Sequence, residues 1–151
     1  MLRITMVMAL VCVLLVMLYA MPKSLITVLE LPSATYYIYS QDDTGLDTGQ
    51  SGRATITRCD YATARQLARH TEGIQGFSMS LATDIAQIKR ILHQLDVIIV
   101  QSEVIGSISS IYGYSPRIAG GINIDGTIIN IQLAYSNGIL HIGSPVILGS
   151  Y

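Results

Sequence analysis

The chain lacks tryptophan, contains only two cysteines, and has charged residues at 13% of its 151 positions. Cys12 lies in an apolar N-terminal run and Cys59 far downstream, so a membrane location of that run would rule out an intramolecular disulfide. Cys59 is then interpreted as a buried small side chain, with a reactive thiol as the alternative. Cysteine and histidine never recur at zinc-ligand spacing, and the aspartates of residues 41–51 do not match an EF-hand loop. We therefore predict no metal and no cofactor.

The short motifs of common enzyme classes are also missing. There is no P-loop, no dinucleotide-binding glycine pattern, no nucleophile elbow and no HExxH. His70, His93 and His141 have no catalytic partner at motif spacing, so we interpret them as structural or surface residues. A glycosidase-type pair formed by Asp96 and Glu103 is unsupported but stays open. We therefore predict no catalytic residues.

The charge balance argues against nucleic acid as a partner. The formal net charge is −1, and it becomes −2 without Arg3 of the N-terminal segment, since eight basic residues then face ten acidic ones. Non-specific nucleic-acid binding depends on neutralising phosphates with Lys and Arg. No nucleic-acid binding is therefore expected.

The first 22 residues predict a signal anchor or a signal peptide. Residues 4–21 are almost continuously apolar and follow Arg3. Cleavage after Ala20 would place Leu18 where a small residue is preferred, and the run is long for a signal peptide. These features favour an uncleaved single-pass membrane anchor over secretion after cleavage. The flanking Arg3 predicts a cytoplasmic N-terminus and an extracytoplasmic remainder.

Residues 23–52 are expected to form membrane-proximal strands and a polar loop. The runs 25–29 and 36–39 consist of strand-forming residues separated by Pro32. Residues 41–51 are polar and glycine-rich, which indicates a solvated loop.

Residues 53–151 predict an α+β domain, a mostly antiparallel sheet backed by two helices. Asp60 is placed to cap a helix that ends near Gly73, and Thr83 to cap a second helix from Asp84 to Leu95. The expected stripe on the second helix is Ile85, Ile88, Leu92 and Leu95. The expected strands are residues 53–58, 77–81, 97–100 and 108–114, with a turn at residues 104–107.

The last third of the chain predicts a β-meander. The pairs Asp125-Gly126 and Asn137-Gly138 are strong signals for tight hairpin turns. They separate residues 121–124, 127–135 and 139–142, and residues 146–148 are a further strand candidate. Within residues 127–135, apolar and polar side chains alternate from Ile129 onward, which predicts one buried face and one wetter face.

The best candidate binding residues are Tyr112, Tyr114 and Arg117. Two tyrosines two positions apart on a strand share a face, and a nearby arginine can add hydrogen bonds to a ligand or partner. The alternative interpretation is a half-buried aromatic pair on a sheet.

The C-terminal stretch carries a family resemblance. Residues 130–135 read Asn-Ile-Gln-Leu-Ala-Tyr, residues 140–147 read Leu-His-Ile-Gly-Ser-Pro-Val-Ile, and the chain ends on Tyr151. This resembles the end of the exported YwmB family of spore-forming Firmicutes, and residues 106–116 resemble the strand before it. The resemblance covers about residues 77–151. It implies a TATA-box-binding-protein-like fold after an N-terminal signal or anchor, and it gives no warrant for DNA binding.

These features lead to a functional hypothesis. We expect a membrane-anchored, non-enzymatic binding or assembly module on the extracytoplasmic side of the bacterial cell membrane. Its partner would be an envelope protein or a wall polymer. The alternative is a cell-wall-acting hydrolase or its accessory subunit.

Overall fold

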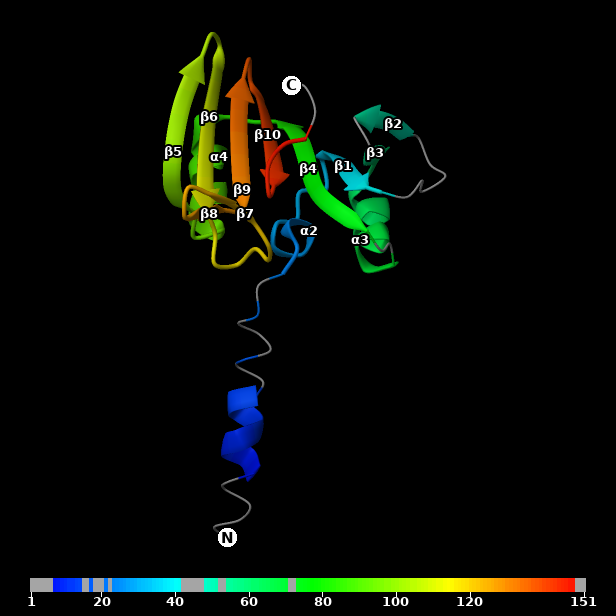
Figure 1. Ribbon diagram of the computed structural model, residues 1–151, viewed down its shortest axis with the longest axis vertical. Helices are drawn as coiled ribbons and strands as arrows, with labels where there is room; N and C mark the ends of the chain where they lie inside the picture. The colour runs from blue at the N-terminus through cyan, green and yellow to red at the C-terminus, as the bar shows by residue number, and fades with distance from the viewer. Residues whose placement is uncertain are drawn as a thin grey trace.

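The computed structural model describes residues 7–14, 17, 21, 23–41, 48–51, 54–70 and 73–148. Within these residues an eight-stranded sheet has the order β2-β3-β1-β4-β10-β9-β6-β5, and β7 and β8 form a separate hairpin (Figure 1). All paired strands are antiparallel.

The helices are α2 (Leu25–Val28), α3 (Tyr61–His70) and α4 (Ile85–Gln94). The strands are β1 (Thr35–Ser40), β2 (Thr48–Ser51), β3 (Ala54–Cys59), β4 (Ile74–Ala82), β5 (Ile98–Ile105), β6 (Ile108–Tyr114), β7 (Ile122–Ile124), β8 (Thr127–Ile129), β9 (Ile131–Ser136) and β10 (Ile139–Ser144). The predicted α+β class with a mostly antiparallel sheet is confirmed.

The predicted N-terminal segment lies only partly within the described residues. Residues 7–14 are helical and lie apart from the sheet in Figure 1. Among the residues that the structure describes, no helix has both the length and the apolar composition needed to cross a membrane.

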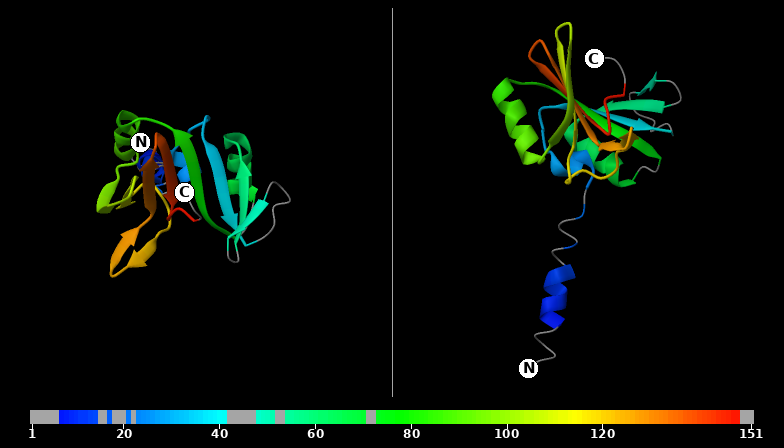
Figure 2. Two further views of the ribbon diagram at one scale, coloured as in Figure 1. Left: turned by 90° about the horizontal axis from the view of Figure 1, so that it is seen from above. Right: turned by 60° about the vertical axis from the view of Figure 1, so that its left-hand side comes forward.

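The helices lie on one face of the sheet, and the C-terminal segment lies on the other (Figure 2). The helix-covered face carries the core, because alternate strand residues such as Tyr36, Met79, Leu133 and Ile142 are buried there. Residues Ile88, Ile91 and Leu95 of the α4 region complete this core. Sheet burial on one face by helices is the usual way an α+β domain forms its core.

One predicted strand is a helix. Residues 25–28 form α2, a single turn closed by a hydrogen bond from the following Leu29 N to Leu25 O at 2.9 Å. Leu25 and Ile26 are fully buried in the core on the helix-covered face. These strand-forming residues adopt a helical turn because core packing in that turn outweighs their local strand propensity. The predicted strand at residues 36–39 is confirmed as β1.

The helix boundaries follow the expected capping chemistry, with one correction. Asp60 Oδ1 accepts a hydrogen bond from Thr63 N at 2.9 Å, as predicted for α3. The predicted cap of α4 is wrong by one residue. Asp84 Oδ1 accepts from Gln87 N at 2.8 Å, while the Thr83 hydroxyl bonds the Gln87 side chain instead.

The predicted apolar stripe of α4 is confirmed at three of its four residues, since Ile88 and Leu95 lie in the core and Leu92 packs against it. Ile85 is 61% exposed, whereas Ile88, Ile91 and Leu95 are buried.

Two predicted loops contain strand. Residues 48–51 of the expected polar loop form β2, and residues 42–47 lie outside the described part of the chain. The expected turn at residues 104–107 narrows to Gly106 and Ser107, because β5 continues to Ile105. Gly106 has a φ of +60°, which suits a tight turn.

The meander differs most from its prediction. The two turns are confirmed, since Asp125 and Asn137 adopt φ values of 50° and 51°. The expected single strand at residues 127–135 is instead two strands, β8 and β9, in different sheets. The predicted wetter face of β9 is buried, with Gln132 4% and Ala134 1% exposed.

The C-terminal segment explains this second correction. After β10 the chain folds back across the sheet, and Ile147 N donates to Gln132 Oε1 at 2.9 Å. A Cβ atom at Gly143 would lie only 2.5 Å from Ile147 N, so glycine allows this close approach. Residues 146–148 therefore cover the sheet rather than extend it as the predicted last strand.

Asn130 separates β8 from β9 and is completely buried. Its Oδ1 accepts from Ser115 N at 2.7 Å, and its Nδ2 donates to Ser115 O and Ile118 O, each at 2.8 Å. The side chain therefore satisfies three backbone groups of the turn after β6. Asn130 itself belongs to neither sheet, because β8 ends at Ile129 and β9 begins at Ile131.

Replacing Asn130 with alanine is predicted to lower the free energy of unfolding by about 3 kcal/mol, because it leaves buried backbone groups without partners. Urea unfolding of the full chain in mild detergent, followed by circular dichroism, measures this. The matched control is Asn123→Ala in an exposed turn, where Asn123 Oδ1 accepts from Gly126 N. Its expected loss is below about 1 kcal/mol. Equal losses for the two variants would contradict the assigned role of Asn130.

Candidate functional site

The face of the sheet opposite the helices, here called the helix-free face, is the candidate functional surface. Cross-strand partners lie on the same face of a sheet, so the register defines two rows of side chains across it. The first row is Arg58, Tyr37, Ser78, Gly143, Gln132, Tyr112 and Gln101. The second row is Thr35, Ser80, His141, Ala134, Ser110 and Glu103.

The helix-free face brings together Ser80 and His141, which lie 61 positions apart in the chain. His141 Nδ1 and Ser80 Oγ are 2.7 Å apart, as direct cross-strand partners on β10 and β4. Burial lowers the pKa of His141 below its ordinary value, which favours the neutral imidazole. The sequence analysis did not find this pair, because neither residue carries a motif and only the strand register joins them.

A serine beside a histidine is the minimum arrangement for nucleophilic catalysis. Such pairs normally need a third group that orients the imidazole. Glu103 is the carboxylate in the same row, but β9 and β6 separate its strand from β10. Three interstrand spacings place the two residues on the order of 14 Å apart. Glu103 instead accepts a hydrogen bond from the Tyr112 hydroxyl at 2.8 Å.

The predicted binding residues Tyr112 and Tyr114 do share the helix-free face, on β6. Both side chains are partly exposed. Tyr112 lies between Gln132 and Gln101 in the first row, and Tyr114 pairs with Ile98 near the start of β5. The Tyr39 hydroxyl lies 3.0 Å from Ser78 Oγ on the same face. Tyr39, Ser78, Ser110 and Gln132 are buried within this face. Its partly exposed polar side chains are therefore Tyr37, Ser80, Tyr112, Tyr114 and His141.

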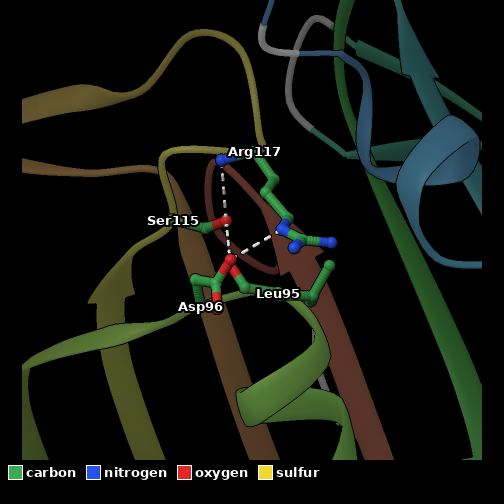
Figure 3. Close-up of polar contacts among 4 residues, drawn as sticks. All are labelled: Leu95, Asp96, Ser115 and Arg117. Carbon is green, nitrogen blue, oxygen red and sulfur yellow. Dashed lines mark hydrogen bonds and ion pairs between the residues drawn. The ribbon is translucent and has the colours of Figure 1, made fainter. Parts of the chain in front are cut away.

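Arg117 is placed differently from the two tyrosines. Its Nε donates to Asp96 Oδ2 at 2.7 Å, beside the C-terminal end of α4 (Figure 3). The turn that carries it is held by Ser115, whose hydroxyl donates to Leu95 O at 2.5 Å and accepts from Arg117 N at 3.2 Å. Since α4 packs on the opposite face, Arg117 is directed toward the helix side of the sheet. Both ion-pair side chains are about half exposed, so the pair contributes little to stability.

An open cleft of about 450 Å³ lies between the start of α2, β4, the chain before β7 and the start of the C-terminal segment. Its lining includes Ser24, Gly76, Phe77, Gly120, Gly121 and Pro145. None of the described residues that line it is ionisable. The cleft therefore suits contact with backbone or apolar groups rather than acid–base chemistry.

Cys59 lies in a second, more open depression together with Arg58 and Asp60. Burial raises the pKa of the Cys59 thiol to about 11, and the nearby Asp60 adds to this effect. A thiol with this pKa is almost entirely protonated at neutral pH, which favours the buried-side-chain interpretation over a reactive one. Among the described residues, no cluster of three His, Cys, Asp or Glu residues could hold a metal ion.

The lowered pKa of His141 predicts a pH dependence of stability. The folded protein binds the proton more weakly than the unfolded chain does, so stability is retained above the unfolded pKa of about 6.5 and is lost as pH falls toward the folded pKa. Urea unfolding between pH 7 and pH 5 should show that His141→Gln loses part of this decline. The exposed His93→Gln is the control and should keep the wild-type profile. Identical profiles for His141→Gln and the wild type would refute the assignment.

Comparisons of the chain with protein-family models, with curated proteins and with solved structures found no match. The proposed function therefore rests on two features, the contacts of the helix-free face and the apolar N-terminal segment.

Proposed function

We propose that this chain is a membrane-anchored, non-enzymatic binding or assembly module that acts on the extracytoplasmic side of a bacterial cell membrane. The observation that carries the binding role is the group of neutral, partly exposed polar side chains on the helix-free face: Tyr37, Ser80, Tyr112, Tyr114 and His141. Its partner would be an envelope protein or a wall polymer, both of which offer hydroxyl, amide and carbonyl groups to such a surface.

The charge distribution of the two rows supports this kind of partner. Arg58 and Glu103 stand at opposite ends of the face, on β3 and β5. Between them lie serine, tyrosine, glutamine and threonine side chains together with a His141 whose lowered pKa favours its neutral form. A polyanion such as nucleic acid is bound mainly through clustered positive charge, which this face does not offer. Neutral donors and acceptors fit a carbohydrate or an extended protein segment better.

The connection to the N-terminal segment supports anchoring close to a membrane surface. Lys23, just after the apolar run, donates from its backbone N to Arg117 O at 3.0 Å, and its carbonyl accepts from Ala119 N at 2.9 Å. The folded domain therefore begins within one or two residues of the apolar run. An anchored chain would present the edge at residues 115–121 to the bilayer.

The proposal includes membership of the YwmB-like exported family and a TATA-box-binding-protein-like arrangement. Two features support it. Helices α3 and α4 each follow a strand of the antiparallel sheet, and both lie on the same face of that sheet.

Exposure outside the membrane is tested by protease accessibility on intact cells, with a tag after Tyr151 detected by immunoblotting. We expect full-length chain in the membrane fraction and complete loss of the tag signal when protease is added. A cytoplasmic marker protein must survive in the same cells. A variant that lacks residues 4–21 is the control and should be protected and soluble. Protection of the full-length chain in intact cells would overturn the proposed location and reopen the question of a nucleic-acid partner.

The alternative function, a cell-wall hydrolase or its accessory, is favoured by the Ser80–His141 pair. The purified chain is predicted to release no soluble fragments from isolated wall material, because the carboxylate in the same row lies three strands away from His141. Fragment release that disappears in Ser80→Ala, but persists in the exposed Ser109→Ala, would instead establish a hydrolase.

A further inference from the structure

The two edges of the main sheet are unlike. At one edge, β2 is four residues long and reads Thr-Gly-Gln-Ser. At the other edge, β5 is eight residues long and reads Ile-Ile-Val-Gln-Ser-Glu-Val-Ile. An edge strand presents unpaired N–H and C=O groups, and natural proteins usually protect it with lysine, proline or short length. β5 has none of these protections, and its one charged residue is Glu103.

The apolar side chains of β5 are strongly exposed. Ile98, Ile99, Val104 and Ile105 are 61%, 54%, 73% and 67% exposed. They stand as two pairs at the two ends of the strand, with Gln101, Ser102 and Glu103 between them. Exposed apolar residues on an unpaired edge indicate a binding surface for another strand.

We propose that a second copy of this chain occupies this edge, and that two β5 strands pair antiparallel about a two-fold axis at Ser102. The pattern of β5 is nearly the same when it is read backwards, as an isologous interface requires. The strand is irregular at Val100, where the pairing with β6 shifts between Ile99 and Gln101. That irregularity decides the register of the proposed dimer.

The register follows from which face each side chain occupies. Ile98 and Ile105 pair with Tyr114 and Ile108 of β6 and so lie on the helix-free face. Ile99 and Val104 lie on the helix-covered face, opposite Gly113 and Ser109. A two-fold axis perpendicular to the sheet keeps each face continuous, so Ile98 meets Ile105 of the second copy and Ile99 meets its Val104. Without the extra residue at Val100, both of these pairs would join side chains on opposite faces of the sheet.

The polar centre is also complementary. In this register Gln101 lies opposite Glu103 of the second copy, and Ser102 lies opposite Ser102. The amide of Gln101 can donate to the Glu103 carboxylate, so the two glutamates do not face each other directly. Like charges directly opposite one another would weaken the pairing. The four apolar pairs would be removed from water on association.

The two-fold axis has a consequence for membranes, which depends on the proposed anchoring. Lys23 is held beside Ile118, next to the end of β6 that pairs with the start of β5. Rotation about Ser102 places the second Lys23 beside the other end of the paired strands. The two N-terminal segments therefore leave the dimer at opposite ends. A pair of anchored copies would join two facing membrane surfaces rather than neighbouring positions in one bilayer.

The first test is the protein mass of the full chain in detergent, measured by size-exclusion chromatography with light scattering. We expect a dimer for the wild type and a monomer for Val104→Lys, which places a charge against Ile99 of the second copy. The control is Ile128→Lys, an exposed isoleucine of the β7–β8 hairpin, which should stay dimeric. A monomeric wild type, or a Val104→Lys dimer, would overturn the pairing.

Two further variants test the register rather than the mere contact. With Cys12 and Cys59 replaced by alanine, Ser102→Cys should form a cross-linked dimer under mild oxidation, and the exposed Ser109→Cys should not. Gln101→Glu should weaken the dimer at least several-fold because it faces Glu103, whereas Gln101→Lys should not weaken it. Equal cross-linking at both cysteines, or equal effects of the two Gln101 variants, would refute this register.

Reconstituted liposomes separate this proposal from the anchoring on which its membrane role rests. Wild-type chain should float with the liposomes and cluster them, and Val104→Lys should float without clustering. Flotation of the wild type without clustering would overturn the bridging arrangement. If the wild type does not float at all, anchoring fails, and the mass measurements still decide the strand pairing independently.

Discussion

The fold depends on one buried side chain, Asn130, which ties the turn after β6 to the start of β9. Its three hydrogen bonds to Ser115 and Ile118 hold a turn that in turn contacts Leu95 at the end of α4 and Lys23 at the start of the domain. Lys23 at the start of the domain, the end of α4 and the central strands therefore meet around one amide. A buried amide can carry this role only when each of its polar groups is satisfied, and here donors and acceptors are matched.

The two faces of the sheet have different physical characters. Helices supply the apolar cover of one face, and a short C-terminal segment covers the middle of the other. That segment contacts Gly143 and Gln132. Elsewhere on this face Tyr37, Ser80, Tyr112 and His141 stay partly exposed. The proposed binding role rests on these side chains, and the hydrogen-bonded Ser80–His141 pair on the same face is the basis of the alternative hydrolase function.

Strand β1 joins the part of the chain before position 52 to the rest of the folded domain. It lies between β3 and β4, so residues before position 52 are part of the same sheet as the strands after it. The apolar N-terminal run is thus followed almost at once by a segment locked into the folded domain. At the far end of the sheet, β5 is left with an apolar edge, and the same continuous sheet links β1 to that edge through β4, β10, β9 and β6.

Local chemistry determined much of this protein from the sequence alone. The Asp60 cap and the Asp125-Gly126 and Asn137-Gly138 turns depend on neighbours within about four positions, so they could be predicted. The division at Asn130, the burial of Gln132, the placing of Arg117 against Asp96 and the Ser80–His141 pair could not. Each needs partners 15 to 61 positions away, and only the tertiary register brings those partners together.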